Sequence, residues 1–142
     1  MKNPTAGDPS FRAAPFKATR RQHFEEAAED YTELVADLID KNGEARTCAI
    51  ADHLGISHVT ALRTIKRLQS SGYLTTSPHR PVELTVKGRK LAAYCKHRHQ
   101  VLLSFFARIG IPEDVAQIDV EGVEHHISKT SLAAIEAFLS RN

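Results

Sequence analysis

The feature that most constrains the fold is a tight turn at Gly55 between two short helical segments. Ile50 and Leu54 lie four residues apart before this turn, as on one face of a helix. After the turn, Ser57 is placed to cap a helix that runs to about Ser70. So close a connection between helices needs a small residue, which Gly55 supplies. The segment therefore predicts a helix-turn-helix.

The flanking segments extend this motif into a winged domain. Upstream, apolar residues recur at helical spacing over residues 24–41, and the pair at 42–43, Asn-Gly, is a typical helix end. Downstream, two β-like runs follow at residues 73–76 and 82–85. The connection between them, residues 77–81, has the sequence Ser-Pro-His-Arg-Pro, which favours a turn. A hairpin, or wing, is therefore expected directly after the helix-turn-helix.

Three further helices are expected in the remainder of the chain. Thr85 is placed to cap a long helix that runs to about Ile109, a length of about 35 Å at ~1.5 Å per residue. Pro112 suits the first turn of a second helix, which continues through roughly His126. Ser128 is placed to cap the last helix. The expected fold class is mainly α with a small β-hairpin wing.

These elements divide the chain into a tail and two domains. Residues 1–22 combine three prolines with small and basic residues and lack apolar periodicity, which predicts a disordered basic tail. Residues 23–85 form the expected winged helix-turn-helix domain, and residues 86–142 a helical domain too small to fold alone. One chain cannot obviously bury all the apolar residues of this second domain, so we expect a homodimer. The candidate dimer core comprises Leu102, Leu103, Phe105, Phe106 and Ile109.

Composition excludes several classes of protein. Hydrophobic residues make up 42% of the 142 residues and charged residues 25%, as in globular proteins. No run of apolar residues is long enough to span a membrane, and the first ten residues lack the apolar core of a secretory signal. Cys48 and Cys95 form no CxxC pair, which argues against a disulfide framework or thiolate zinc site and fits a reducing cytoplasm.

The net charge of +2 is small, but the charges are unevenly distributed. Residues 1–22 and 57–98 are strongly basic, with a single acidic residue in each segment. Acidic residues gather instead at 25–40 and 113–124. A basic middle between acidic flanks favours a nucleic-acid surface beside a cation-binding region, although chance surface charge produces such patterns too.

The helix after Gly55 has two distinct faces. At helical steps of 100°, Ala61, Ile65 and Leu68 fall within one narrow arc, which we expect to be buried. On the opposite side, Arg63 is placed to read a guanine edge and Val59 a thymine methyl in a major groove. The alternative is a charged surface helix with no ligand.

The predicted DNA-contacting set adds the start of this helix and the tip of the wing. Wing tips commonly touch phosphate or the minor groove, but an arginine there can equally be merely solvated. The set comprises Ser57, His58, Val59, Thr60, Arg63, Lys66, Arg67 and Arg80. The partner implied is double-stranded DNA.

The sharpest chemical feature is an acidic and histidine-rich run over residues 119–126. Glu121, Glu124 and His125 stand at i, i+3 and i+4, so on a helix their side chains share one face. Two carboxylates converging there would repel unless a cation were present. Carboxylate oxygens and an imidazole suit a divalent metal ion. The alternative is a solvated polar face.

Two weaker features accompany this run. Asp30 and Glu33 lie at i and i+3 on the first helix, a pair that surface helices also carry without a ligand. His97 and His99 lie on the long helix about 200° apart, so at most one of them faces a shared site. Periodicity does not choose between the two histidines.

Taken together, these stretches resemble the diphtheria-toxin-repressor family of metal-dependent regulators. The matching segments are Glu29-Asp30-Tyr31-Thr32-Glu33, the helix-turn-helix, Arg98-His99 and Glu121-Gly122-Val123-Glu124-His125-His126. The match covers about residues 25–140 and is closest to the manganese-transport-regulator branch of the family. The run over 121–126 and the run over 29–33 are specific, whereas the helix-turn-helix alone is not.

The resemblance implies a winged helix-turn-helix followed by a metal-binding and dimerisation domain. It implies six metal ligands: Asp30, Glu33, His99, Glu121, Glu124 and His125. It chooses His99 over His97 and makes Glu124 the bridge if two ions bind. Iron-responsive members typically carry a sulfur ligand at the positions of Asp30 and Glu121, so Mn²⁺ is the implied cofactor, with Fe²⁺ the alternative. We expect no C-terminal SH3-like domain, and the tail over 1–22 lies outside the pattern.

The expected function is that of a manganese-dependent repressor of manganese uptake genes, which binds palindromic operator DNA as a homodimer. An ion held by both domains would set the distance between the two recognition helices. The alternatives are an iron-responsive repressor, a winged-helix regulator with another signal, and a small di-metal hydrolase. No nucleophile motif or substrate loop favours the hydrolase. We therefore expect no enzyme activity, no small organic substrate and no membrane partner.

Overall fold

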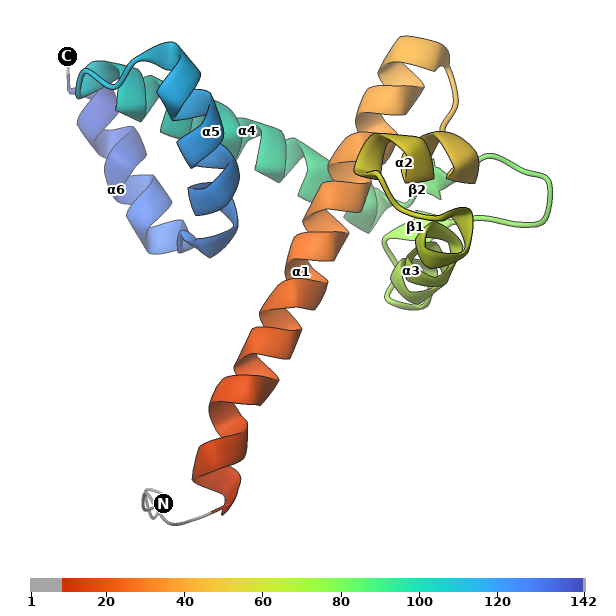
Figure 1. Cartoon of the computed structure of the whole chain (residues 1–142). Coiled ribbons are helices and arrows are strands. Elements are labelled where there is room, and N and C mark those ends of the chain that lie inside the picture. Colours follow the sequence, from red (N-terminus) through yellow and green to blue (C-terminus); the bar gives the residue numbers. More distant parts are fainter. Residues whose placement is uncertain (1–8, 142) are drawn as a thin grey trace.

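The computed structural model describes the backbone of residues 9–141 and the side chains of residues 19–141. Helices dominate the chain, and one short two-stranded hairpin interrupts them (Figure 1). The elements are α1 (Pro9–Asn42), α2 (Thr47–Leu54), α3 (His58–Ser70), β1 (Leu74–Thr75), β2 (Glu83–Leu84), α4 (Val86–Arg108), α5 (Glu113–Val123), the 3₁₀ turn η1 (Glu124–His126) and α6 (Lys129–Ser140).

The elements from α1 to β2 enclose the first core. Val35 of α1, Ile50 of α2 and Ile65 of α3 are fully buried there. The strands β1 and β2 pair antiparallel, with Leu74 opposite Leu84, and the hairpin projects at the edge of the core. This arrangement is the expected winged helix-turn-helix.

Local signals placed the helix boundaries correctly in this part of the chain. The hydroxyl of Ser57 accepts a hydrogen bond from the amide of Thr60 and caps α3. The hydroxyl of Thr85 caps α4 by accepting from the amide of Gly88. At Gly55 the backbone has a φ of 66°, a left-handed conformation that glycine adopts without strain. The turn therefore has the geometry that its sequence predicts.

A second core lies between α4, α5 and α6. It contains Val101 and Leu102 of α4, Val120 of α5 and Leu132 of α6. Leu102 is only 1% exposed within a single chain, so its assignment to the dimer core was wrong. The Leu102 side chain packs against the subunit's own helices, and helical periodicity alone does not reveal this.

The chain differs from the sequence-based expectation at two helix ends. Helix α1 begins at Pro9, so residues 9–22 are helical where a disordered tail was expected; residues 1–8 lie outside the described residues. Proline is tolerated in a first helical turn, and this segment continues a helix that is anchored further along. The second difference is the end of α5. This helix stops at Val123, and η1 replaces the last helical turn expected through His126.

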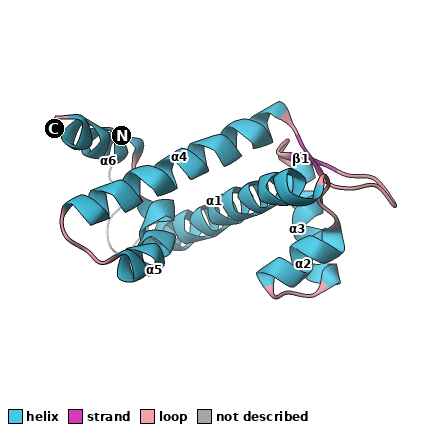
Figure 2. Cartoon of the chain, turned by 90° about the horizontal axis from the view of Figure 1, so that it is seen from above, coloured by secondary structure: helices cyan, strands magenta, loops and turns pink. Residues whose placement is uncertain are grey.

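Helices α1 and α4 connect the two cores. They pack against each other where they cross: α4 passes behind α1 in Figure 1 and lies beside it in the view of Figure 2. Helix α5 and η1 lie against α4 near the middle of α1. Residues from the first helix and from the C-terminal domain therefore meet where α1, α4 and η1 converge. None of the helices in the described part of the chain is long and apolar enough to cross a bilayer.

Candidate metal centre and nucleic-acid interface

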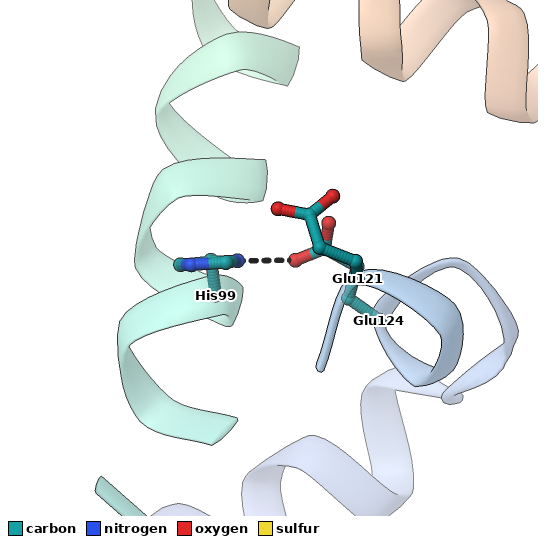
Figure 3. Close-up of side chains that lie close together, drawn as sticks. All are labelled: His99, Glu121 and Glu124. Carbon is teal, nitrogen blue, oxygen red and sulfur yellow. Dashed lines mark hydrogen bonds and ion pairs between the residues drawn. The ribbon is translucent and has the colours of Figure 1, made fainter. Parts of the chain in front are cut away.

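Three of the predicted ligands converge between α4 and the end of α5. His99 of α4, Glu121 of α5 and Glu124 of η1 each offer a ligand atom, and these atoms lie within 4.8 Å of one another (Figure 3). The Nδ1 atom of His99 lies 2.7 Å from a carboxylate oxygen of Glu124. Glu124 is 2% exposed, whereas Glu121 faces solvent. The cluster therefore has a buried side and an open side.

A second group shares Glu124 with the first. His125 points its Nε2 atom toward Asp30 of α1, at 3.3 Å, and toward Glu124, at 3.8 Å. Burial and the neighbouring carboxylates raise the pKa of Asp30, although the nearby imidazole of His125 opposes the rise. Glu124 thus lies between His99 on one side and His125 with Asp30 on the other.

Glu33 completes the set of six. It lies at the wall of a groove of about 910 Å³ that His99 and Glu121 also line. Its Oε1 atom is buried and has no hydrogen-bond partner among the described residues. Burial, with the charge of Glu124 nearby, raises the pKa of Glu33 to about 7. A buried carboxylate oxygen without a partner is costly unless a cation or donor satisfies it.

The structure also reveals two residues whose roles sequence reasoning missed. Arg98 of α4 is buried and donates two hydrogen bonds to Glu29 of α1, at 3.2 and 2.6 Å. The other contact of Glu29 is with Nδ1 of His125, at 2.6 Å. Burial would raise the pKa of Glu29, but the hydrogen bonds from Arg98 and His125 hold it below the ordinary value. Both residues belong to the family-like motifs, the only available sequence signal.

This arrangement fixes the ring of His125. Glu29 holds Nδ1, so Nε2 is the atom left to face Asp30 and Glu124. Burial would lower the pKa of His125, but the hydrogen bond that it donates to Glu29 and the charge of Asp30 raise it. Metal-binding histidines commonly have their second nitrogen anchored by a carboxylate in this way.

The two histidines on α4 have different surroundings. His97 pairs with Glu136 of α6 at the surface, away from the carboxylate cluster. His99 faces that cluster. The expectation that only one of the pair reaches the site therefore agrees with the geometry. The next histidine along η1, His126, contacts Gln22 and Glu26 of α1 instead.

The donor chemistry fits a divalent cation. The six residues provide carboxylate oxygens and imidazole nitrogens, which suit Mn²⁺ and Fe²⁺. The nearest thiol, Cys95, is fully buried, and burial raises its pKa so that it stays protonated. A bound divalent cation would match these hard and borderline donors and would satisfy the Glu33 oxygen, which has no partner among the described residues.

The predicted recognition face of α3 is exposed. Ala61, Ile65 and Leu68 are fully buried on the opposite side, as their spacing predicted. Val59 is 65% exposed on this face. The whole outward set faces solvent: His58, Val59, Thr60, Arg63, Lys66 and Arg67.

Three members of the predicted DNA-contacting set have additional features. Ser57 caps α3, and its hydroxyl also donates to that of Thr60, at 2.9 Å. The guanidinium of Arg67 lies 5.0 Å from the centre of the Phe24 ring on α1. Arg80 is exposed in the loop that joins the two strands. An apolar residue among several cations on an exposed helix is typical of a face that enters a DNA groove.

Two family models match the chain in sequence order. Residues 23–82 match the N-terminal DNA-binding domain of iron-dependent repressors. Residues 85–142 match the metal-binding and dimerisation domain of the same proteins.

Individual relatives agree with these models. The chain is 40% identical to transcriptional regulator MntR of Salmonella typhimurium over 89% of this chain and 81% of the relative. It is 36% identical to the HTH-type transcriptional regulator MntR of Bacillus subtilis over 75% of each chain. A solved manganese-dependent transcriptional repressor in complex with manganese superposes with a TM-score of 0.71 at 28% identity. That match covers 81% of this chain and 53% of the other, so this chain spans about half the length of the solved repressor.

Proposed function

Because this chain belongs to the diphtheria-toxin-repressor family of metal-dependent transcriptional regulators, we propose that it represses transcription by binding operator DNA when loaded with manganese. The observation that carries this proposal is the meeting of α1 and η1 at one carboxylate cluster. Asp30 comes from the helix that enters the DNA-binding domain, whereas Glu124 and His125 come from the helical domain. The proposed site therefore links the part of the molecule that reads DNA to the part that dimerises.

The six residues act as a clamp. A bound cation supplies positive charge that offsets the repulsion among carboxylates held close together. Glu33 and Asp30 are held on α1, while His99 is held on α4 and Glu121 on α5. Joined through one site, these helices keep a single relative orientation. Only the fraction of molecules in that orientation binds the operator tightly, so DNA affinity rises with occupancy of the site.

We propose two ions per subunit, with Glu124 as the shared ligand. Its carboxylate lies between His99 with Glu121 on one side and His125 with Asp30 on the other. A buried carboxylate has two oxygens and can serve two neighbouring cations. Glu33, whose Oε1 atom lacks a partner among the described residues, supplies the remaining buried oxygen.

Manganese is preferred to iron because of the ligand at two positions. Asp30 and Glu121 both offer hard carboxylate oxygens, which favour Mn²⁺ by hardness and geometry. Intrinsic affinity places Mn²⁺ below Fe²⁺ for most sites, so the response depends on the shape that each ion produces. The names of the MntR relatives and of the manganese-bound repressor support the same choice.

The DNA-binding unit is a homodimer in the cytoplasm. The matched C-terminal family domain is described as a dimerisation domain. Helix α5 carries exposed apolar side chains, of which Ile118 is 75% exposed, Val115 44% and Val123 41%. Ile109, from the predicted dimer core, is 53% exposed just before this helix. A second copy is the occupant that this face fits, and it would align two recognition helices with a palindromic operator.

The proposal is tested by metal-dependent DNA binding of the full chain. Duplexes are first selected from a random-sequence pool with the Mn²⁺-loaded protein, and affinity is then measured by fluorescence anisotropy. The Mn²⁺-loaded protein should bind tightly, the chelator-treated protein weakly, and Glu124→Gln weakly under both conditions. Equal affinity with and without chelator would disprove the switch.

Two comparisons sharpen this experiment. Glu136→Gln makes the same chemical change at a surface carboxylate that pairs with His97, and it should respond to Mn²⁺ like the wild type. A titration with Fe²⁺ under anaerobic conditions then tests the metal preference. If the protein saturated with Fe²⁺ binds the operator more tightly than the protein saturated with Mn²⁺, it is an iron-responsive member of the family.

A further inference from the structure

The first helix continues well beyond the domain that it belongs to. Helix α1 has 34 residues, and its N-terminal part projects past both domains in Figure 1. The family match begins at residue 23, so the segment from 9 to 22 lies outside it. A helical segment of this length gains little stability by itself, because most helical stability in proteins comes from packing of one face.

The extension carries an excess of positive charge. Between Asp8 and Glu25 the sequence contains four lysine or arginine residues and no acidic residue. Of these, Arg20 and Arg21 lie within the part whose side chains are described, and both are exposed. The charge therefore favours an anionic partner.

The position of Phe24 relates this charge to the recognition helix. Phe24 packs against the core of the winged domain, and Arg67 of α3 lies over its ring at 5.0 Å. Arg20 and Arg21 precede Phe24 by four and three residues, so all three share one side of α1. They lie about one turn, or ~5.4 Å, further along the axis than Phe24.

The base of the extension on α1 contacts the turn that carries proposed metal ligands. Glu26 lies 3.3 Å from His126 of η1, and Gln22 also contacts that imidazole. Because η1 carries Glu124 and His125, the turn that holds proposed metal ligands also holds the base of the extension. The extension is therefore positioned together with the recognition helix.

We propose that the N-terminal extension of α1 is a second DNA-binding element, in which Arg20 and Arg21 contact backbone phosphates beside the groove that α3 enters. The inference rests on the proposed function, because it needs DNA on the exposed face of α3. Two observations support it. The extension is positively charged, and Phe24 at its base contacts Arg67 on the exposed face of α3. Phosphate contacts add affinity that depends on salt and not on sequence.

The test measures DNA affinity against salt for full-length, Mn²⁺-loaded variants. Arg20→Gln and Arg21→Gln, singly and together, are compared with Lys41→Gln, which removes one exposed charge at the opposite end of the same helix. The probes are the selected operator duplex and a random-sequence duplex of equal length. Each arginine variant should lose affinity several-fold on both probes, with a salt slope shallower by about 0.9. Lys41→Gln should leave both quantities unchanged.

The outcomes separate this inference from the proposed function. Mn²⁺-dependent operator binding with an unchanged salt slope in the arginine variants overturns the inference and leaves the repressor intact. Loss of dimer in sedimentation, with a normal salt slope, shows instead that the extension binds a second copy. Absence of Mn²⁺-dependent binding in the wild-type protein overturns both proposals.

Discussion

At the scale of single residues, the most informative contact is the one that Glu29 makes with two cationic partners. The family resemblance implied six ligands, and the structure brings all six into one region. The sequence did not predict that Glu29 would contact both Arg98 and His125, because these two residues lie 69 and 96 positions away from Glu29. Spacing along one helix identifies residues that share a face, but contacts between distant elements depend on how the helices pack.

Glu29→Gln should therefore weaken Mn²⁺ binding without removing a ligand. The amide holds the His125 ring less firmly, and loss of such an anchor typically costs about 10–100-fold in metal affinity. The measurement is Mn²⁺ affinity by competition with a chelating dye. Glu26→Gln is the matched control, since Glu26 contacts His126 and not His125. Equal losses in the two variants would contradict the anchoring role.

Glu29→Gln is also checked for folding, because Glu29 forms an ion pair with the buried Arg98. Glu29→Gln leaves the buried guanidinium beside an uncharged group, which lowers the stability of the metal-free protein as well. Urea unfolding without metal measures that loss. The anchoring role requires Mn²⁺ affinity to fall even at temperatures where both proteins are fully folded.

Glu33 gives the metal-free protein a specific pH dependence. Its pKa is about 7 in the folded chain against an ordinary value of 4.5, because burial and Glu124 disfavour its charged form. The folded state thus holds this proton more tightly than the unfolded state does. Its contribution to stability is therefore present below about pH 4.5, falls as the pH rises to about 7 and is constant above that.

The measurement is urea unfolding of metal-free wild-type protein and Glu33→Gln from about pH 5 to about pH 8, the range around the folded pKa. The difference between wild type and variant isolates Glu33 from Asp30 and His125, which also titrate. Wild-type stability should fall relative to the variant as the pH rises. A difference that stays the same at every pH would show that Glu33 has an ordinary pKa.

At the scale of elements, the chain was most predictable where a single residue type determines the local backbone. Ser57 and Thr85 cap the helices that they were expected to cap, and Gly55 adopts the left-handed turn. The end of α5 was less predictable, because no breaker follows Val123 and η1 tightens where Glu124 becomes buried. Packing, and not propensity, ends that helix.

Gly88 shows the same limit of sequence reasoning. It lies in the first turn of α4, where a Cβ atom would stand 2.1 Å from the carbonyl oxygen of Tyr73. Gly88→Ala should therefore push the wing away from α4 and destabilise the metal-free protein by about 1–3 kcal/mol. Gly122→Ala is the control, since nothing lies within 4 Å of its added methyl group. Gly122→Ala should be neutral or slightly stabilising, because alanine favours a helix.

Urea unfolding of both glycine variants provides the comparison. If Gly88→Ala is as stable as Gly122→Ala, the hairpin accommodates the methyl group without strain, and its packing on α4 is looser than this close approach indicates.

At the scale of the whole molecule, periodicity identified apolar faces but not their partners. Leu102 and Ile109 were both predicted for the dimer core, yet Leu102 is buried by the subunit's own helices and Ile109 is half exposed. Ile109 caps the end of α4 and follows Leu102 by seven residues, so both satisfy the same helical pattern. Only the fold distinguishes a face used inside one chain from a face left open, and here the open face extends onto α5.

The exposed face of α5 gives the last prediction. Ile118 is 75% exposed, so a charged residue there should cost the isolated subunit little, whereas a charge buried between two copies is strongly unfavourable. Ile118→Glu should therefore shift the protein from dimer to monomer in sedimentation and keep its helical content. Gln117→Glu adds the same charge at the neighbouring exposed position and should remain dimeric. Since two recognition helices must bind together, the monomeric variant should also lose operator affinity while retaining Mn²⁺. A dimer that survives Ile118→Glu would move the interface to another face of the helical domain.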